Sequence, residues 1–140
     1  MTEFEIEIRK KVGAISCADF KGSESIKEII MLWHTPKGVE LCKKSDFPSS
    51  DMFERYWRDF LTHNVFVNCD CVALTNKDCV MYNSVGTLKF EYPEKVYDVI
   101  LYGDNVVTIR AEKYSIVNIH NLNNSVVIIE KDDTSIVNVD

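Results

Sequence analysis

Asn105-Val106-Val107-Thr108-Ile109 is the first of four five-residue segments that recur at intervals of ten residues. The other three are Ser115-Ile116-Val117-Asn118-Ile119, Ser125-Val126-Val127-Ile128-Ile129 and Ser135-Ile136-Val137-Asn138-Val139. The first place is always Asn or Ser, the third is always Val, and the fifth is Ile or Val. A fixed period with aligned identities is typical of repeat architectures, because ordinary alternating strands have no reason to repeat side-chain identity.

A short parallel β-solenoid is the fold that this repeat favours. A strand of about five residues and a turn of about five cannot close a coil, so two repeats are expected to form one coil of about twenty residues. The third and fifth places then point inward as stacked ladders, made by Val107, Ile109, Val117, Ile119, Val127, Ile129, Val137 and Val139. The alternative is an antiparallel β-sandwich or meander, which also has strands every eight to twelve residues or so.

Polar residues of the repeats are expected on the outside and in the turns. Thr108, Asn118 and Asn138 would face solvent. The turn asparagines would stack along the turns, where asparagine tolerates the left-handed backbone conformation; these are Asn121, Asn123 and Asn124.

Helical signals dominate the first 64 residues. Thr2 and Glu5 are three apart, as are Ser25 and Glu28, which is the spacing of a capping box. Apolar residues follow each pair at helical spacing. These patterns predict helices over about 3–15 and 26–34.

Two further helices are expected before the repeats. Pro36 directly after Thr35 predicts a short helix through Cys42, since proline suits the first helical position. A strongly amphipathic last helix is predicted by the spacing of the apolar residues Met52, Phe53, Tyr56, Trp57, Phe60 and Leu61. The chain is therefore expected to be α+β, with an N-terminal helical subdomain, residues 1–64, that caps a C-terminal parallel β-solenoid, residues 65–140.

Composition limits the classes of function. The chain has 140 residues, of which 46% are hydrophobic and 27% charged, as in globular proteins. A net charge of −6 disfavours nucleic-acid binding, because phosphates attract positive charge. The sequence has neither an apolar run of about 18 residues nor a secretory signal at its acidic N-terminus. We expect a cytoplasmic protein with no nucleic-acid or membrane partner.

The cysteines predict reduced thiols. The chain contains five, an odd number with no export signal, at Cys17, Cys42, Cys69, Cys71 and Cys79. Three of them form, with His63, the one cluster of metal-like composition, namely Cys69, Cys71 and Cys79. The one-residue spacer between the first two does not suit structural zinc, so small buried hydrophobes are the favoured interpretation. We expect no metal and no cofactor.

A resemblance supports the same architecture. A helical head containing Lys37-Gly38-Val39-Glu40-Leu41-Cys42-Lys43-Lys44-Ser45-Asp46-Phe47-Pro48-Ser49, joined to a ten-residue Val/Asn repeat, resembles small uncharacterised proteins of gut bacteria and their mobile elements. The likeness covers nearly the whole chain. It implies the fold and carries no activity or site residues.

The sequence favours a non-enzymatic protein-interaction or oligomerisation module. The sequence shows a regular repeat and has no P-loop, dinucleotide fingerprint or nucleophile elbow. The last repeat is followed only by Asp140, so an uncovered coil is expected to pair with a second copy as a homodimer or to dock on another protein. The expected interface residues are Ile136, Val137, Val139 and Asp140.

Two other functions stay open. A pocket where the helices meet the first coils, near Trp33, Tyr56, Trp57 and Cys69, would make the chain a small-molecule-binding protein or an enzyme. Alternatively, the chain is a phage-type structural or host-binding component, since β-solenoids are frequent among such proteins.

Overall fold

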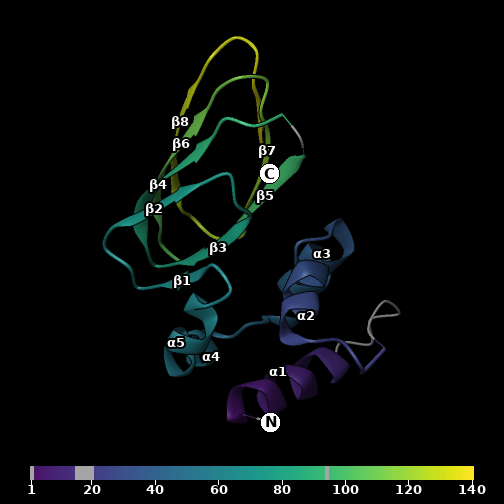
Figure 1. Cartoon of the computed structure of the whole chain (residues 1–140). Coiled ribbons are helices and arrows are strands. Elements are labelled where there is room, and N and C mark those ends of the chain that lie inside the picture. The colour runs from purple at the N-terminus through teal and green to yellow at the C-terminus, as the bar shows by residue number, and fades with distance from the viewer. Residues whose placement is uncertain (1, 15–20, 94) are drawn as a thin grey trace. The chain divides into compact units, whose positions relative to one another are not determined.

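The chain is α+β, with a helical region followed by a parallel β-solenoid (Figure 1). The computed structural model describes residues 2–14, 21–93 and 95–140. The chain divides into two compact units, Met1–Asp59 and Phe60–Asp140. Among the described residues, no helix combines the length and the apolar character needed to cross a membrane.

The described residues form five helices, most of them where capping signals predict them. The helices are α1 (Glu3–Ala14), α2 (Ile26–Trp33), α3 (Pro36–Ser45), α4 (Ser50–Arg55) and α5 (Trp57–Leu61). Ser25 Oγ accepts the Glu28 N–H, and the Glu28 carboxylate accepts the Ser25 N–H, so this capping box is confirmed. Thr35 Oγ1 accepts the Gly38 N–H at the start of α3. Ile15, the last residue of the predicted first helix, lies outside the described residues.

The prediction of a single helix from Met52 to Leu61 is wrong, because two helices occupy this segment. Ser49 caps α4, and the backbone leaves helical geometry at Tyr56, with φ −112° and ψ 24°, before α5 begins. The break interrupts the helical periodicity of the apolar face. Trp57 and Leu61 are consequently 43% and 42% exposed, although the pattern placed them on that face.

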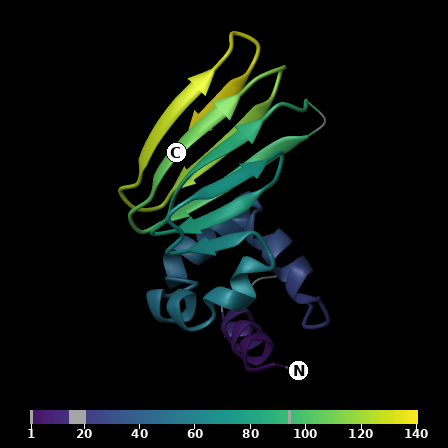
Figure 2. The same ribbon diagram turned by 60° about the vertical axis from the view of Figure 1, so that its left-hand side comes forward.

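Every strand pairing in the solenoid is parallel, so the antiparallel alternative is wrong for the described residues. The odd-numbered strands form a five-stranded sheet and the even-numbered strands a four-stranded sheet, stacked coil upon coil (Figure 2). The strands are β1 (Val65–Val67), β2 (Val72–Thr75), β3 (Cys79–Tyr82), β4 (Val85–Phe90), β5 (Val96–Tyr102), β6 (Val106–Ala111), β7 (Ile116–Asn121), β8 (Val126–Lys131) and β9 (Ile136–Val139).

Strand register confirms two repeats to a coil. Val106 pairs with Val126, and Ile116 pairs with Ile136, in each case twenty residues on. Upstream the spacing is shorter, since Val65 pairs with Val80, fifteen residues on. The aligned identities fade where the spacing changes.

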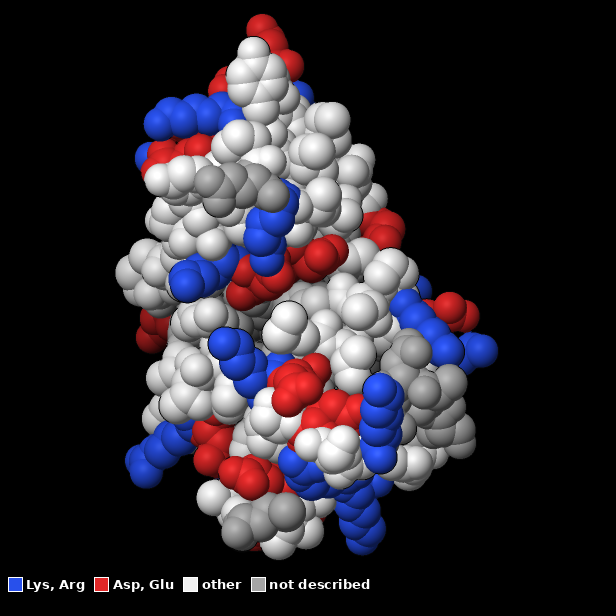
Figure 3. Space-filling model, turned by 45° about the vertical axis from the view of Figure 1, so that its right-hand side comes forward, with Lys and Arg blue, Asp and Glu red and all other residues white. Residues whose placement is uncertain are grey.

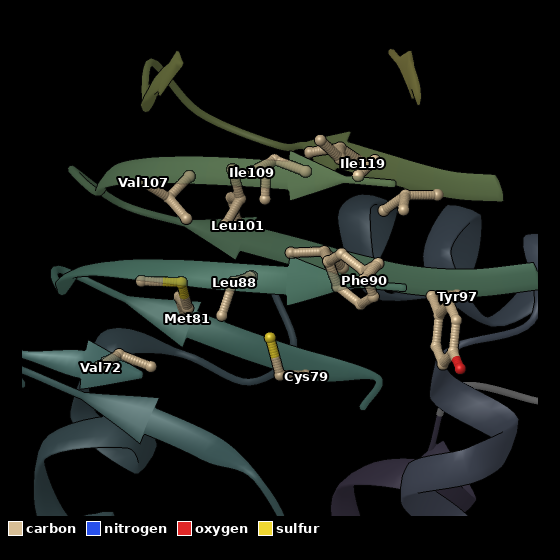
Figure 4. Close-up of a cluster of buried hydrophobic side chains, with 13 residues drawn as sticks. Val72, Cys79, Met81, Leu88, Phe90, Tyr97, Leu101, Val107, Ile109 and Ile119 are labelled. Carbon is tan, nitrogen blue, oxygen red and sulfur yellow. The ribbon is translucent and has the colours of Figure 1, made fainter. Parts of the chain in front are cut away.

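The core lies between the two sheets. Figure 4 shows Val107, Ile109 and Ile119 pointing into this space together with side chains of the earlier coils. Val107, Ile109 and Val117 have no exposed surface, and Ile119 has almost none. The predicted interior ladder is therefore confirmed for β6 and β7.

Polar side chains at the first place of the repeats are buried at the corners of the coils. Asn105 Oδ1 accepts the Ser84 N–H at 2.8 Å, and Asn105 Nδ2 donates to the Tyr102 carbonyl at 2.8 Å. Ser125 Oγ accepts the Asn105 N–H at 3.1 Å. At the opposite corner Ser135 Oγ accepts the Ser115 N–H. These bonds satisfy backbone groups that would otherwise be buried without partners.

The turn asparagines singled out from the sequence do not adopt the left-handed conformation. The asparagines with positive φ are Asn64, Asn68, Asn76 and Asn83. Asn121 instead ends β7, where its side-chain amide bonds both the N–H and the carbonyl of Ser125. This bridge turns the chain without a left-handed residue.

Gly86 lies where two coils approach closely, and its replacement should destabilise the solenoid. A Cβ atom there would lie 2.3 Å from the Val72 carbonyl oxygen and 2.5 Å from Val72 Cβ. We expect Gly86→Ala to lower the free energy of unfolding by about 2 kcal/mol, because backbone must shift to admit the methyl group. Urea denaturation followed by circular dichroism measures this. Thr87→Ala, at an exposed neighbouring position, is the control, and equal losses in the two variants would contradict the close approach.

Candidate functional site

The coil formed by β8 and β9, here called the β8–β9 coil, leaves inward-facing positions exposed. Ile129 is in register with Ile109, and Val139 with Ile119. Ile109 and Ile119 are buried, whereas Ile129 is 42% and Val139 46% exposed. The same pattern of side chains that fills the core in one coil is therefore at the surface in the next.

Exposed apolar side chains surround these two positions. Val127 and Val137 are half-buried and pack against the core. Val126, Ile128 and Ile136 face outward and are about half exposed. Several large apolar side chains thus cluster on one coil, and such clusters on a protein surface commonly mark interaction sites.

Hydrogen bonds to the preceding coil hold the β8–β9 coil in place. The Val126 N–H donates to the Asn105 carbonyl at 2.8 Å, and the Ile136 N–H donates to the Ser115 carbonyl at 2.9 Å. Asn138 Nδ2 donates to Asn118 Oδ1 at 3.0 Å on the outer face. The exposed apolar side chains are therefore presented on an ordered backbone.

The turn between β8 and β9 is organised by Asp132. Its Oδ1 accepts the Thr134 hydroxyl at 2.7 Å, and its Oδ2 accepts the Lys113 N–H at 3.1 Å. The hydrogen bond from Thr134, followed by that from Lys113, lowers the pKa of Asp132 to about 2. This carboxylate is ionised at neutral pH.

Charged side chains around the β8–β9 coil are mainly acidic. Residues 122–140 contain the acids Glu130, Asp132, Asp133 and Asp140 and the base Lys131, a net charge of −3. Glu130 pairs with Arg110 of β6 at 2.8 Å. On the face drawn in Figure 3, Lys and Arg side chains are intermingled with Asp and Glu.

His120 joins three strands on the outer face of the five-stranded sheet. It lies within β7. Its Nε2 is 3.4 Å from Asp98 Oδ1, and its Nδ1 is 3.1 Å from Asp140 Oδ2. The hydrogen bond to Asp98 raises the pKa of His120 and the charge of Asp140 adds to this, while partial burial opposes both.

All four expected interface residues lie on the β8–β9 coil or directly after it. Ile136 and Val139 are exposed, and Val137 is half-buried. Asp140 contacts His120. This contact was not expected from the sequence. The spacing of twenty residues between His120 and Asp140, which equals the length of one coil, is the signal that could have predicted it.

The residues of the expected pocket are spread over both units. Trp33 is buried in the first unit, with its ring centroid 5.9 Å from that of Phe47. Tyr56 is buried against Phe4, at 5.5 Å between ring centroids. Trp57 is partly exposed, and Cys69 belongs to the second unit and is half-buried. A pocket that unites the four residues stays a prediction.

Two hollows occur elsewhere in the described part of the chain. A cavity of about 200 Å³ in the first unit is lined by Lys11, Phe47 and Met52 among others. An open groove of about 410 Å³ on the second unit is lined mainly by charged side chains, including Arg110 and Glu130. In neither case is the lining made by a residue of the expected pocket.

The cysteines occupy different environments. Cys79 is fully buried in the core, and this burial raises the pKa of its thiol. The interpretation as a buried hydrophobe is correct for Cys79 and wrong for Cys71, which is exposed. Among residues 2–14, 21–93 and 95–140, no three His, Cys, Asp or Glu side chains are grouped so that they could hold a metal ion. Cys17 lies outside these ranges.

No family model matches the chain, and no curated protein or solved structure matches it. The resemblance to small proteins of gut bacteria stays a prediction. Evidence for a function therefore comes from the chain's own geometry.

Proposed function

We propose that the chain is a non-enzymatic protein-interaction module that pairs with a second copy through the β8–β9 coil. The observation that carries the proposal is the exposure of Ile129 and Val139 at positions whose counterparts, Ile109 and Ile119, are buried one coil earlier. Another coil stacked on these positions would bury them in the same way. A second copy supplies that coil.

The pattern of β8 is complementary to itself. A two-fold axis perpendicular to a strand pairs it with its own copy in antiparallel orientation. With the axis at Ile128, Val127 lies opposite the partner's Ile129 on the inner face. Reversal of the strand therefore places apolar residues against apolar residues.

The pattern of β9 has the same property at the equivalent place of its repeat. An axis at Asn138 sets Val137 opposite the partner's Val139. Asn138 meets the partner's Asn138, and an amide both donates and accepts hydrogen bonds. The proposed dimer has one two-fold axis that passes through both strands, at Ile128 and at Asn138.

Light scattering and sedimentation of the 140-residue chain test the proposal. The wild type is expected to be a dimer at tens of micromolar. The variant Ile136→Lys/Val139→Lys should be a folded monomer, because it introduces four like charges at the paired strands of the dimer. Val85→Lys/Val96→Lys, which alters two comparably exposed valines on β4 and β5, is the matched control and should remain dimeric.

Two results would contradict the proposal. One is a monomeric wild type at 200 µM or so, which would favour a different protein as the partner. The other is a dimer that persists in the Ile136→Lys/Val139→Lys variant, since it would place the interface elsewhere. Circular dichroism of every variant distinguishes dissociation from unfolding.

A further inference from the structure

We propose that His120 is a pH-sensitive latch on the β8–β9 coil, so that self-association through this coil strengthens on acidification. The inference rests on the proposed function and adds a mode of regulation to it. It is carried by the position of one imidazole ring between two carboxylates, one on β5 and the other directly after β9.

Both ring nitrogens of His120 face acceptors. Nε2 lies 3.4 Å from Asp98 Oδ1, and Nδ1 lies 3.2 Å and 3.1 Å from the two carboxylate oxygens of Asp140. An ionised carboxylate can only accept hydrogen bonds, whereas neutral imidazole donates from one nitrogen and imidazolium from both. The observed arrangement is fully bonded only when His120 is protonated.

The two carboxylates connect neighbouring strands across β7. Asp98 is on β5, and Asp140 directly follows β9. A protonated His120 therefore ties the last strand of the β8–β9 coil to the strand two coils before it. When His120 loses its proton, one nitrogen presents a lone pair to a carboxylate, and that tie becomes repulsive.

Further charged groups of the second unit lie next to Asp98. Asp78, next to β3, accepts the Asp98 N–H at 2.9 Å and pairs with Lys95 at 2.8 Å. On β7 itself the outward-facing neighbour of His120 is the uncharged Asn118, which accepts a hydrogen bond from Asn138 of β9. Lys95 thus compensates Asp78, and His120 is the base that lies between Asp98 and Asp140.

The latch lies at the edge of the proposed dimer interface. With the two-fold axis at Asn138, Asp140 of one copy comes opposite the partner's Ile136. A carboxylate next to an apolar side chain is costly to desolvate unless it is paired. Protonated His120 pairs it in both copies, so its deprotonation weakens the interface twice.

The sign of the pH dependence follows from the same contacts. The pKa of His120 is raised above the ordinary value of about 6.5. A group with a raised pKa in the folded state stabilises that state fully below its unfolded pKa, and the stabilisation is lost as pH rises through the folded pKa. The latch is therefore closed below the ordinary value of about 6.5, and it opens as pH rises through the raised pKa of His120.

The first experiment measures the latch without reference to association. Proton NMR titration of the histidine ring signals is expected to give His120 a pKa above 6.5, and Asp98→Asn should lower it. A His120 pKa at or below about 6.5, or one that Asp98→Asn leaves unchanged, would overturn the latch.

The second experiment measures its effect on association. Sedimentation of the wild type at pH 6.0 and 8.5 should show a dimer dissociation constant that is about three- to tenfold larger at pH 8.5, as expected for the loss of one partly exposed ion pair in each copy. His120→Gln should remove this difference. His63→Gln is the matched control, because it removes a histidine from the same chain and should retain the difference.

The outcomes separate the inference from the proposed function. A wild type that is monomeric at both pH values overturns the proposed dimer and its regulation, while the NMR titration still decides whether the latch exists. A dimer whose dissociation constant is equal at both pH values supports the interface and overturns its regulation by His120. A pH dependence that His120→Gln leaves intact also overturns the regulation, since another group must then cause it.

Discussion

Val117→Asp is expected to unfold the solenoid at 25 °C and neutral pH. Val117 has no exposed surface and stacks between Tyr97 and Val137 in the interior of the five-stranded sheet. The position offers no hydrogen-bond partner to a carboxyl group, whether ionised or protonated. The substitution also removes the buried methyl groups of Val117. We expect a loss of at least about 4 kcal/mol, against a typical total stability of about 5–15 kcal/mol.

Far-UV circular dichroism during urea denaturation provides the measurement for Val117→Asp. Thr108→Asp is the matched control, because it introduces the same side chain at an outward-facing position of β6 and should change the midpoint little. A Val117→Asp variant that unfolds at the wild-type midpoint would show that the position is not part of a packed interior.

Asn105→Ala should be the second most destabilising substitution. Asn105 is 1% exposed, and its side chain bonds the Ser84 N–H, the carbonyls of Tyr102 and Met81, and Ser125 Oγ. Its removal leaves several buried groups without a partner, each costing about 1–3 kcal/mol. We expect a loss of roughly 3–5 kcal/mol in the free energy of unfolding, allowing for partial relaxation.

Two companion variants make the test of Asn105 specific. Asn123→Ala removes an amide that accepts the Gly103 N–H at an exposed turn, so its cost should stay below about 1 kcal/mol. Asn105→Ser installs the residue found at the same corner in the adjacent coils, Ser84 and Ser125, and should recover part of the loss. If Asn105→Ala and Asn123→Ala are equally stable, the corner bonds contribute little.

Most of the fold could be predicted because the repeats align so closely. The repeats from Asn105 onward carry the same residue types at their third and fifth places, which indicates that these places have equivalent surroundings in every repeat. Parallel stacking of the coils provides such surroundings. The capping signals at Ser25 and Thr35 were equally local and equally reliable. The short strands β1 and β3 were not picked out one by one, because their sequences share little with the repeat.

The errors have physical causes that sequence pattern does not report. Apolar spacing from Met52 to Leu61 continues through the backbone break at Tyr56, so it could not reveal two helices. Nothing in the sequence pattern indicated that the Asn or Ser at the first repeat place is buried, whereas in the structure these residues are buried and bond the neighbouring coil. A polar residue that recurs at one place of a repeat can mark a corner of the coil where buried backbone groups need hydrogen-bond partners.

The His120 cluster escaped prediction for a different reason. Asp98, His120 and Asp140 are about twenty residues apart, and only the register of the coils makes them neighbours. Once two repeats are assigned to a coil, a spacing of twenty identifies His120 and Asp140 as adjacent. The exposure of Ile136 and Val139 was, by contrast, expected from the sequence.

The difference between the ten-residue sequence repeat and the twenty-residue coil sets the step by which this architecture can grow. Inserting one pair of repeats adds a coil and keeps Asn118 and Asn138 in one row of the same sheet. Inserting a single repeat between β7 and β8 would move both later strands to the opposite sheet, so that Asn138 would join the sheet of Thr108 and Asp140 would no longer lie beside His120. Duplication of a pair, and not of a single repeat, is therefore the unit of length variation that preserves both faces.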